Sequence, residues 1–319
     1  MTRIGFAAFG LCLLASAAVA QDGYPSRNVT IVVPLAAGSG TDIMARVLAA
    51  SLTAKLGKPF TVENRPGANG ITGTDYLARQ PNDGYTLMIG GNTTHSANPH
   101  LSKNVKYDPI KDFTPVSRLV TVGAVLVVPP GGSIRSIDDL VREARANPGK
   151  LTYGAPNSGA QIASETIKKM RGLDITRVPY RATPQAMTDV IAGTITTTFV
   201  DVAAALSNVT SGRLLALAIT SAKRSALLPN VASMHELGFT GFDLTYWSGL
   251  FGPANLPAGV VSVLDRAASE IMNEASMQET LRGLGLDPSH MPALAMPAYV
   301  KIEMDRWGVF VRDAGIEPN

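Results

Sequence analysis

The stretch VVPLAAGSGTDIMARVLAASL, residues 32–52, contains the change from strand to helix that decides the fold. Residues 29–34 form an apolar run typical of a buried strand, and residues 41–56 have the apolar spacing of a helix. Gly57 stands where a helix commonly ends in left-handed backbone. The loop between strand and helix consists of small residues and contains no lysine or arginine.

A loop of this composition favours the binding of an anion by backbone groups. The first N–H groups of a helix lack partners within the helix, and its N-terminus carries about half a positive charge. Gly38, Ser39 and Gly40 allow close approach of an anion without an arginine. The same residues also fit a tight connection in which Thr41 or Asp42 caps the helix. A phosphate loop is excluded, because no Gly-Lys-Ser/Thr follows.

The rest of the chain alternates short apolar runs with helix-like segments, which predicts an α/β protein. Expected strands are residues 60–63, 85–89 and 151–153, and expected helices are residues 71–79, a segment capped by Ser136 and a segment from Thr183 to Gly193. Two β-like runs, residues 124–128 and 247–251, bracket a central segment. We therefore expect residues 21–122 plus 247–319 to form one lobe and residues 123–246 a second, joined by two crossing strands. A single continuous α/β domain is the alternative.

The first twenty residues predict secretion. Arg3 precedes an apolar run over residues 4–14, and Ala18-Val19-Ala20 ends the segment, so residues 1–20 resemble a signal peptide cleaved after Ala20. The run is shorter than the roughly 20 residues that a spanning helix needs. Cys12, the only cysteine, lies inside it, so the mature protein has no disulfide.

Composition and motifs argue against several classes of function. The formal net charge of +3 is close to neutral and disfavours nucleic-acid and membrane partners. Ser39 and Ser158 lie outside any Gly-x-Ser-x-Gly elbow, and His235 has no second histidine at zinc-protease spacing. His95 and His100 have no carboxylate or cysteine between them, which makes a poor metal site, and we place them on the surface or on a pocket wall. We expect no enzyme activity, no metal and no cofactor.

Longer motifs occur in order along the chain. They are YPSRNVTIVVPLAAGSGTDIMARVLA at residues 24–49, VENRPGANGITGTDYLARQPNDGYTLMIG at 62–90 and VPYRATPQAMTDVIAG at 178–193. Over essentially its whole mature length, the chain resembles the Bug-type solute receptors of the tripartite tricarboxylate transporter family. The resemblance implies a periplasmic, monomeric, two-lobed binding protein of type II that closes on a small carboxylate. The implied partners are membrane subunits of the transporter, with a membrane sensor kinase as the alternative.

Three loops at strand ends are expected to form the ligand site, because open α/β sheets bind ligands at the carboxyl ends of their strands. They are the loop before residue 41, the GGNTTH segment at 90–95, and YGAPNSGAQ at 153–161, where Ser158 is the expected helix cap. The expected contacts are Leu35, Ala36, Ala37, Gly38, Ser39, Thr41, Asp42, Asn92, Thr93, Thr94, Asn157, Ser158, Gly159, Ala160, Gln161, Tyr180, Arg181 and Asp201.

Some of these positions depart from the family pattern or admit two interpretations. Leu35, Ser39 and Ala182 stand where the family often has Phe, Gly and Gly, and Gln161 replaces a common histidine. Asp201 is expected near an amine, hydroxyl or bridging water, or else caps the following helix. The neighbouring candidate Arg181 pairs with a distal ligand carboxylate or with a surface acid. Aliphatic acids such as citrate, aromatic acids such as terephthalate and amino acids all fit these donors, so the ligand skeleton stays open.

Overall fold

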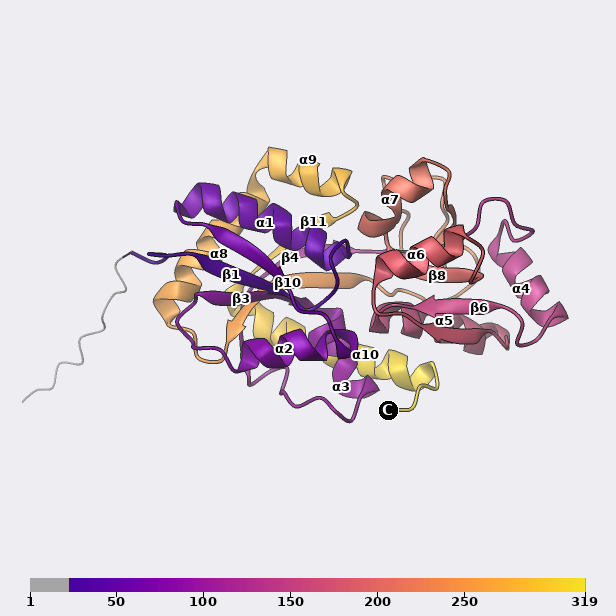
Figure 1. Ribbon diagram of the computed structural model, residues 1–319, viewed down its shortest axis with the longest axis horizontal. Helices are drawn as coiled ribbons and strands as arrows, with labels where there is room; N and C mark the ends of the chain where they lie inside the picture. The colour runs from indigo at the N-terminus through magenta and orange to yellow at the C-terminus, as the bar shows by residue number, and fades with distance from the viewer. Residues whose placement is uncertain (1–22, 319) are drawn as a thin grey trace, which may run out of the picture.

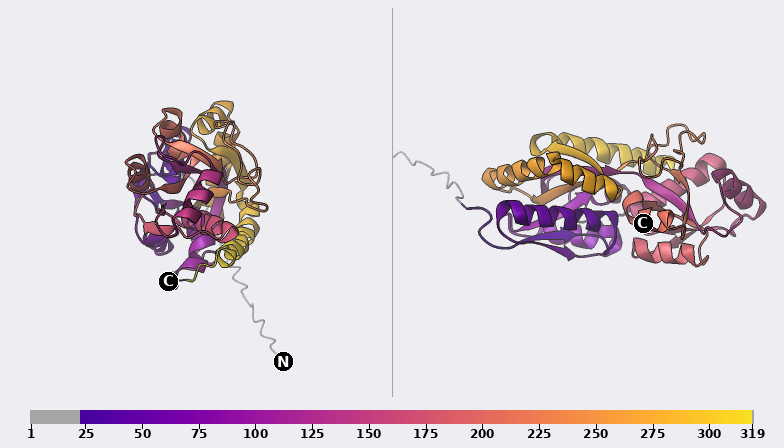
Figure 2. Two further views of the ribbon diagram at one scale, coloured as in Figure 1. Left: turned by 90° about the vertical axis from the view of Figure 1, so that its right-hand side faces the viewer. Right: turned by 90° about the horizontal axis from the view of Figure 1, so that it is seen from above.

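The computed structural model describes residues 23–318, and the predicted signal peptide lies outside them. Two β-sheets lie next to each other along the long axis of the molecule, and helices cover both (Figure 1). Viewed from above, helices flank the sheets on both faces (Figure 2). The predicted α/β, two-lobed architecture is therefore confirmed. In the described part of the chain, no helix combines the length and the apolarity that crossing a membrane demands.

The first sheet has six strands in the order β11-β4-β10-β3-β1-β2. Its strands are β1 (Val29–Val33), β2 (Phe60–Asn64), β3 (Thr86–Gly91), β4 (Phe113–Val122), β10 (Tyr246–Pro253) and β11 (Asp287–Pro292). β1 is parallel to β2 and β3, while β10 runs antiparallel between β3 and β4. Because both faces of the sheet are covered, the four apolar residues of β1 are buried, and Thr30 alone in this strand is partly exposed.

Six helices surround this sheet. They are α1 (Gly40–Leu56), α2 (Ile71–Ala78), α3 (Asn98–Leu101), α8 (Ala258–Asn273), α9 (Ala275–Gly283) and α10 (Met296–Asp313), together with a π-helical turn at Asn92–Ala97 and short 3-10 turns at Ala68–Gly70 and Ala293–Ala295. α1 buries Met44, Leu48 and Leu52 in the core. It ends as predicted at Gly57, whose φ of 71° suits glycine and whose N–H bonds to the Thr53 carbonyl.

The second sheet has five strands in the order β7-β6-β8-β5-β9. The strands are β5 (Ala124–Val128), β6 (Thr152–Ala155), β7 (Thr176–Pro179), β8 (Thr197–Asp201) and β9 (Leu215–Ile219). The helices are α4 (Ile137–Ala146), α5 (Ser158–Arg171), α6 (Thr183–Ile191) and α7 (Val202–Thr210). Ser136 caps α4 as predicted, because its hydroxyl accepts a hydrogen bond from the Asp139 N–H at 3.0 Å.

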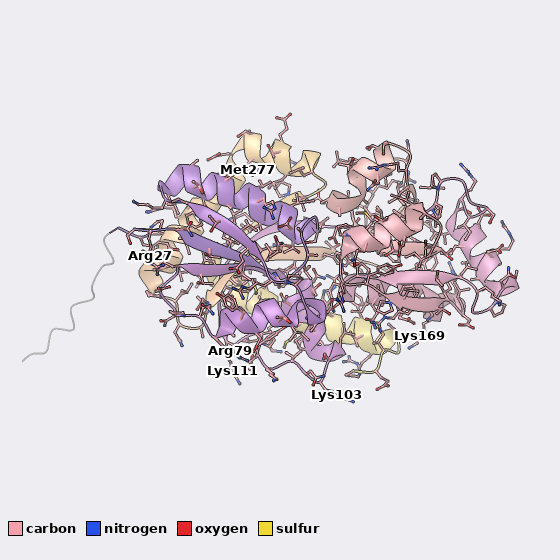
Figure 3. All side chains as sticks on the ribbon, viewed as in Figure 1. Arg27, Arg79, Lys103, Lys111, Lys169 and Met277 are labelled. Atoms are coloured by element: carbon pink, nitrogen blue, oxygen red, sulfur yellow. The ribbon has the colours of Figure 1, made fainter. Side chains whose placement is uncertain are left out.

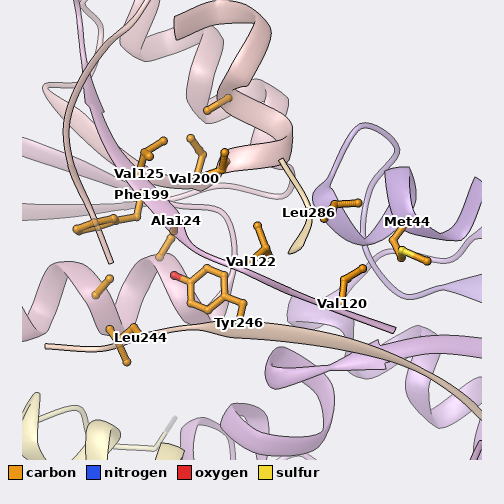
Figure 4. Close-up of a cluster of buried hydrophobic side chains, with 14 of the residues drawn as sticks. Met44, Val120, Val122, Ala124, Val125, Phe199, Val200, Leu244, Tyr246 and Leu286 are labelled. Atoms are coloured by element: carbon orange, nitrogen blue, oxygen red, sulfur yellow. The ribbon is translucent and has the colours of Figure 1, made fainter. Parts of the chain in front are cut away.

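Both sheets follow one plan, in which a strand arriving from the other sheet inserts antiparallel beside the third strand. β10 takes this place in the first sheet and β5 takes it in the second. The chain crosses between the sheets at Gly123, between β4 and β5, and again just before β10. Figure 4 shows the buried side chains packed around these crossings, including Val122, Ala124 and Tyr246.

We propose these two crossings as the lobe boundaries, with residues 21–122 plus 247–319 in one lobe and 123–246 in the other. The last helix departs from a simple division, because α10 reaches across and contacts α5 of the second sheet (Figure 1). Arg306 of α10 donates a hydrogen bond to the Asp243 carbonyl at 2.6 Å, just before the second crossing. α10 therefore supports the hinge from one side.

Candidate functional site

A small pocket lies between the two sheets, at the carboxyl ends of β1, β3 and β8. Its volume is about 20 Å³, enough for about one water molecule. The lining residues are Leu35, Gly40, Thr41, Asn92, Thr93, Val122, Asn157, Asp201, Tyr246, Ser248 and Leu286. Residues of both lobes line the pocket, which in this arrangement is too small for an organic ligand.

The N-terminus of α1 forms one wall, and its start is fixed by Ser39 rather than by Thr41 or Asp42. The Ser39 hydroxyl accepts a hydrogen bond from the Asp42 N–H at 3.2 Å. Asp42 instead holds the loop, since its Oδ2 accepts from the Gly38 N–H and from Arg46, both at 3.0 Å. Burial alone would raise the pKa of Asp42, but the bonds from Arg46, Gly38 and Asn64 outweigh it and lower that pKa. Asp42 thus stays ionised and keeps the loop rigid.

Gly40 is the point where the two lobes approach most closely at this helix end. A Cβ atom on Gly40 would lie 2.8 Å from Asp201 Oδ2, at the end of β8 in the other lobe. The Gly40 backbone N–H lies near the Asp201 carboxyl group and favours its ionised form. Burial is the larger effect and raises the pKa of Asp201 to about 6. Asp201 has part of its surface open to the pocket, and protein atoms enclose the rest.

The segment after β3 supplies the second wall, as a π-helical turn instead of a plain loop. Asn92 and Thr93 line the pocket, as expected. Thr94 turns inward, and its hydroxyl lies 2.8 Å from Nδ1 of His95. His95 is fully buried and stacks on Phe251 with ring centroids 4.0 Å apart, so the expected surface or wall position was wrong. Burial lowers the pKa of His95 to about 3, so the ring is neutral.

The N-terminus of α5 forms the third wall, and its cap is Asn157 instead of the expected Ser158. Asn157 Oδ1 accepts from the Ala160 N–H at 2.9 Å. The Ser158 hydroxyl does not cap the helix. It points to the first lobe and donates a hydrogen bond to Asn98 Oδ1 at 2.8 Å. Asn69 Nδ2 donates to the same Ser158 oxygen, and Asn98 Nδ2 binds the Asn69 carbonyl at 2.9 Å. These three side chains, Ser158, Asn98 and Asn69, form a latch between the lobes.

Replacing Ser158 with alanine removes the serine's part of the latch without changing the pocket lining. We expect ligand affinity to fall about fivefold, because the two hydrogen bonds of the Ser158 hydroxyl, each contributing about 0.5 kcal/mol, form only when the lobes are together. Isothermal titration with a bound carboxylate measures the change. Ser164→Ala is the matched control, since Ser164 is a buried serine on α5 whose hydroxyl has no hydrogen-bond partner among the described residues. Equal affinities of the two variants would contradict the latch.

The remaining expected contacts are not among the described residues that line the pocket. They are Ala36, Ala37, Gly38, Ser39, Asp42, Thr94, Ser158, Gly159, Ala160, Gln161, Tyr180 and Arg181. The Tyr180 hydroxyl donates to Asp189 at 2.6 Å, and Arg181 is exposed. Gly159 packs under the ring of Tyr246, because a Cβ there would lie 2.6 Å from the ring. Gly38 also lies near the other lobe, because a Cβ atom on it would lie 3.3 Å from Cγ of Pro184.

Several pocket residues were not predicted from the sequence, because they come from the crossings and from the C-terminal segment. Tyr246 and Ser248 belong to β10, Val122 ends β4, and Leu286 precedes β11. The aromatic and polar residues of YWSG were a usable signal, since they open the predicted second crossing strand. The Tyr246 hydroxyl is buried without a hydrogen-bond partner among residues 23–318. Burial first, and the nearby Asp201 second, raise the pKa of Tyr246, which keeps it a neutral donor.

A larger cavity of about 420 Å³ lies directly behind the pocket, on the far side of the crossings. Sequence neighbours divide between the two spaces: Val122, Asp201 and Tyr246 face the pocket, and Gly123, Val202 and Thr245 line the cavity. Among the described residues that line the cavity, none belongs to the N-terminus of α1 or α5. Those two helix N-termini contribute to the smaller pocket instead.

The pocket has almost no formal charge. Asp201 is the only ionisable side chain besides Tyr246 among its described lining residues, and none is a lysine or arginine. The basic side chains Arg27, Arg79, Lys103, Lys111 and Lys169 lie at the outer edges of the molecule (Figure 3). Within residues 23–318, no three His, Cys, Asp or Glu side chains are grouped as a metal site would require. Any anion bound here is held by N–H and O–H donors.

A protein-family model that matches most of the chain identifies the family to which it belongs. Residues 44–316 match the model described as the tripartite tricarboxylate transporter family receptor. The chain belongs to this family. The protein BugT of Bordetella pertussis is 32% identical over 99% of this chain and 98% of its own length. As a member of this receptor family, the chain is a periplasmic solute-binding protein and not an enzyme.

Solved structures of similar proteins share the fold. A protein of R. palustris solved with adipate is 32% identical, with a TM-score of 0.90, and covers 93% of this chain and 100% of its own. The periplasmic binding protein BugD is 30% identical, with a TM-score of 0.88, over 93% of this chain and 100% of its own. MatC of Rhodopseudomonas palustris, with bound malate, is 27% identical, with a TM-score of 0.84, over 90% of this chain and 100% of its own.

Proposed function

We propose that this receptor captures a small carboxylate in the pocket between its lobes and delivers it to the membrane subunits of a tripartite tricarboxylate-type transporter. The ligand carboxylate binds at the N-terminus of α1, next to Gly40 and Thr41. Hydroxyl and amide groups of Thr93, Asn92 and Asn157 complete its surroundings. The protein acts as a monomer in the periplasm after removal of residues 1–20.

The observation that carries this proposal is the meeting of two helix N-termini in one interlobe pocket that has no basic side chain. A helix N-terminus offers unpaired N–H donors and a positive partial charge, which favour an anion. The starts of α1 and α5 contribute Gly40, Thr41 and the cap Asn157 to the pocket wall. The adipate and malate bound to the relatives are both carboxylates, in agreement with this chemistry.

Hydrogen bonds can supply the free energy of binding even though the pocket has no positively charged side chain among its described lining residues. A micromolar dissociation constant corresponds to about −8 kcal/mol, and a hydrogen bond to a charged group contributes roughly 1.5–3 kcal/mol. Three or four such bonds reach this range when the binding costs are small. The fixed loop around Asp42 keeps those costs low, because its N–H groups are already oriented. Closure of the lobes excludes water and strengthens each bond.

A thermal-shift panel tests the proposal. The protein from residue 21 onward is heated with adipate, malate, citrate, terephthalate and glutamate, and with the neutral amide of each acid. We expect at least one acid at 1 mM to raise the melting temperature by several degrees, while its amide gives no shift. Shifts from amides as large as those from acids, or no shift from any acid after ligand-free refolding, would contradict carboxylate binding.

A further inference from the structure

Asp201 is an acidic group at the place where the proposed ligand carboxylate binds, and this juxtaposition needs an explanation. It ends β8 and faces the start of α1 from the opposite lobe. A Cβ on Gly40 would lie 2.8 Å from Asp201 Oδ2, and Gly40, Thr41 and Asp201 line the same pocket. The helix end that attracts an anion therefore already has an internal acid beside it.

Among the residues that the structure describes, no lysine or arginine lines the pocket beside this acid. On α1 the nearest acid is Asp42, whose partners are Arg46 and Asn64. On β10, Tyr246 supplies a neutral hydroxyl, and α7 and β5 have no ionisable side chain. Asp287 on β11 lines the cavity behind the crossings, where Lys223 and Arg224 also lie. Arg224 is engaged by Glu236 at 2.9 Å.

Two carboxylates cannot both remain charged at one enclosed helix end without a large mutual repulsion. Burial already raises the pKa of Asp201 to about 6, whereas free aliphatic carboxyls titrate near pH 4. When the two groups meet, the proton therefore stays on Asp201, and the ligand remains ionised. A protonated Asp201 has an O–H that donates a hydrogen bond to the ligand carboxylate, and its other oxygen stays an acceptor.

We propose that Asp201 binds one proton together with the ligand, so that it selects a carboxylate by donating a hydrogen bond to it. This inference rests on the proposed carboxylate function. The proton comes from solvent, no covalent bond between heavy atoms changes, and the added proton offsets the one negative charge that the bound carboxylate group brings next to Asp201. Asp201 thereby determines the specificity of the site. Its O–H donates to a ligand carboxylate, which is an acceptor, and cannot bond in this way to a ligand ammonium group, which is only a donor.

The test is calorimetric titration of the whole mature protein with adipate, or with the panel acid of greatest thermal shift if adipate gives none. Titrations at pH 7.5 in phosphate and in Tris, which differ in ionisation enthalpy, measure proton uptake. We expect close to one proton per ligand. From pH 7 to 8 the affinity should fall about tenfold, and it should level off as the pH falls through about 6 toward 5, before the ligand carboxyl groups themselves take up protons.

Two variants separate Asp201 from the rest of the protein. Asp201→Asn keeps the shape of the side chain and supplies a permanent N–H donor, so it should bind the acid with no proton uptake and no pH dependence between pH 6 and 8. Asp287→Asn removes the neighbouring carboxyl, whose pKa burial also raises, and should behave as the wild type. Wild-type binding without proton uptake would overturn the inference. So would a ligand amine whose affinity rises with pH and is lost in Asp201→Asn.

These outcomes are distinct from a failure of the proposed function. If no acid of the panel binds the wild type or Asp201→Asn at any pH, carboxylate binding itself is wrong, and this inference falls with it. If an acid binds with a constant affinity from pH 6 to 8, only the role of Asp201 is wrong.

Discussion

Gly40→Ala is expected to weaken carboxylate binding by at least tenfold while leaving the protein folded. Gly40 is the first residue of α1, and a Cβ there would lie 2.8 Å from Asp201 Oδ2 and 3.2 Å from Asp201 Cβ and Cγ. The methyl group therefore occupies the point where the lobes close over the helix end. Alanine also favours helix over glycine by about 1 kcal/mol, so the melting temperature should change little. Isothermal titration and a thermal melt check the two expectations.

Gly259→Ala is the matched control for this prediction. Gly259 lies in the first turn of another long helix, α8, and a Cβ there would meet nothing within 4 Å. It should bind the acid as the wild type does. If Gly40→Ala also binds with unchanged affinity, the ligand does not lie at the start of α1.

Gly91→Ala is expected to give the largest loss of stability among the substitutions considered. Gly91 ends β3 opposite Ser248 of β10, and a Cβ on it would lie 2.1 Å from the Trp247 carbonyl oxygen. That atom belongs to the backbone of the central strand, so the two strands must separate. Overpacking of a tight interior costs about 1–3 kcal/mol, and we expect the upper end of this range. For a protein of this size the melting temperature should fall by about 6–10 °C.

Gly131→Ala is the control, since a Cβ at Gly131 would meet nothing within 4 Å. Melting of the two variants by circular dichroism measures the difference. A Gly91→Ala protein as stable as Gly131→Ala would contradict the close β3–β10 approach that places Asn92 and Thr93 in the pocket.

Local patterns predicted the α/β architecture and the helix end at the site. The apolar run before Pro34, the small loop and Gly57 are all short-range signals, and the structure confirms the strand and helix they indicate. The cap of α4 at Ser136 was equally readable. For α5, Asn157 and Ser158 are both good caps, and sequence alone favoured the wrong one. Ser158 is instead required by Asn98, a residue distant along the chain.

The pocket itself depends on contacts that no local pattern encodes. Leu35, Thr41, Asn92, Thr93, Asn157 and Asp201 were expected contacts that do line it. Tyr246, Val122 and Leu286 join them only because the crossings and the turn before β11 meet at the hinge. The shared strand plan of the two lobes was also invisible in the sequence, because packing preserves the order of strands without repeating their residues.

The central claim is that a ligand carboxylate binds at the N-terminus of α1 between the lobes. A crystal structure of the mature protein with the acid of greatest thermal shift tests it most directly. We predict a carboxylate oxygen about 2.7–3.1 Å from the N–H of Gly40 or Thr41, or joined to it by one water, with the Asp201 carboxyl beside it. A carboxylate bound by Arg181, or lying in the cavity behind the crossings, would contradict the account.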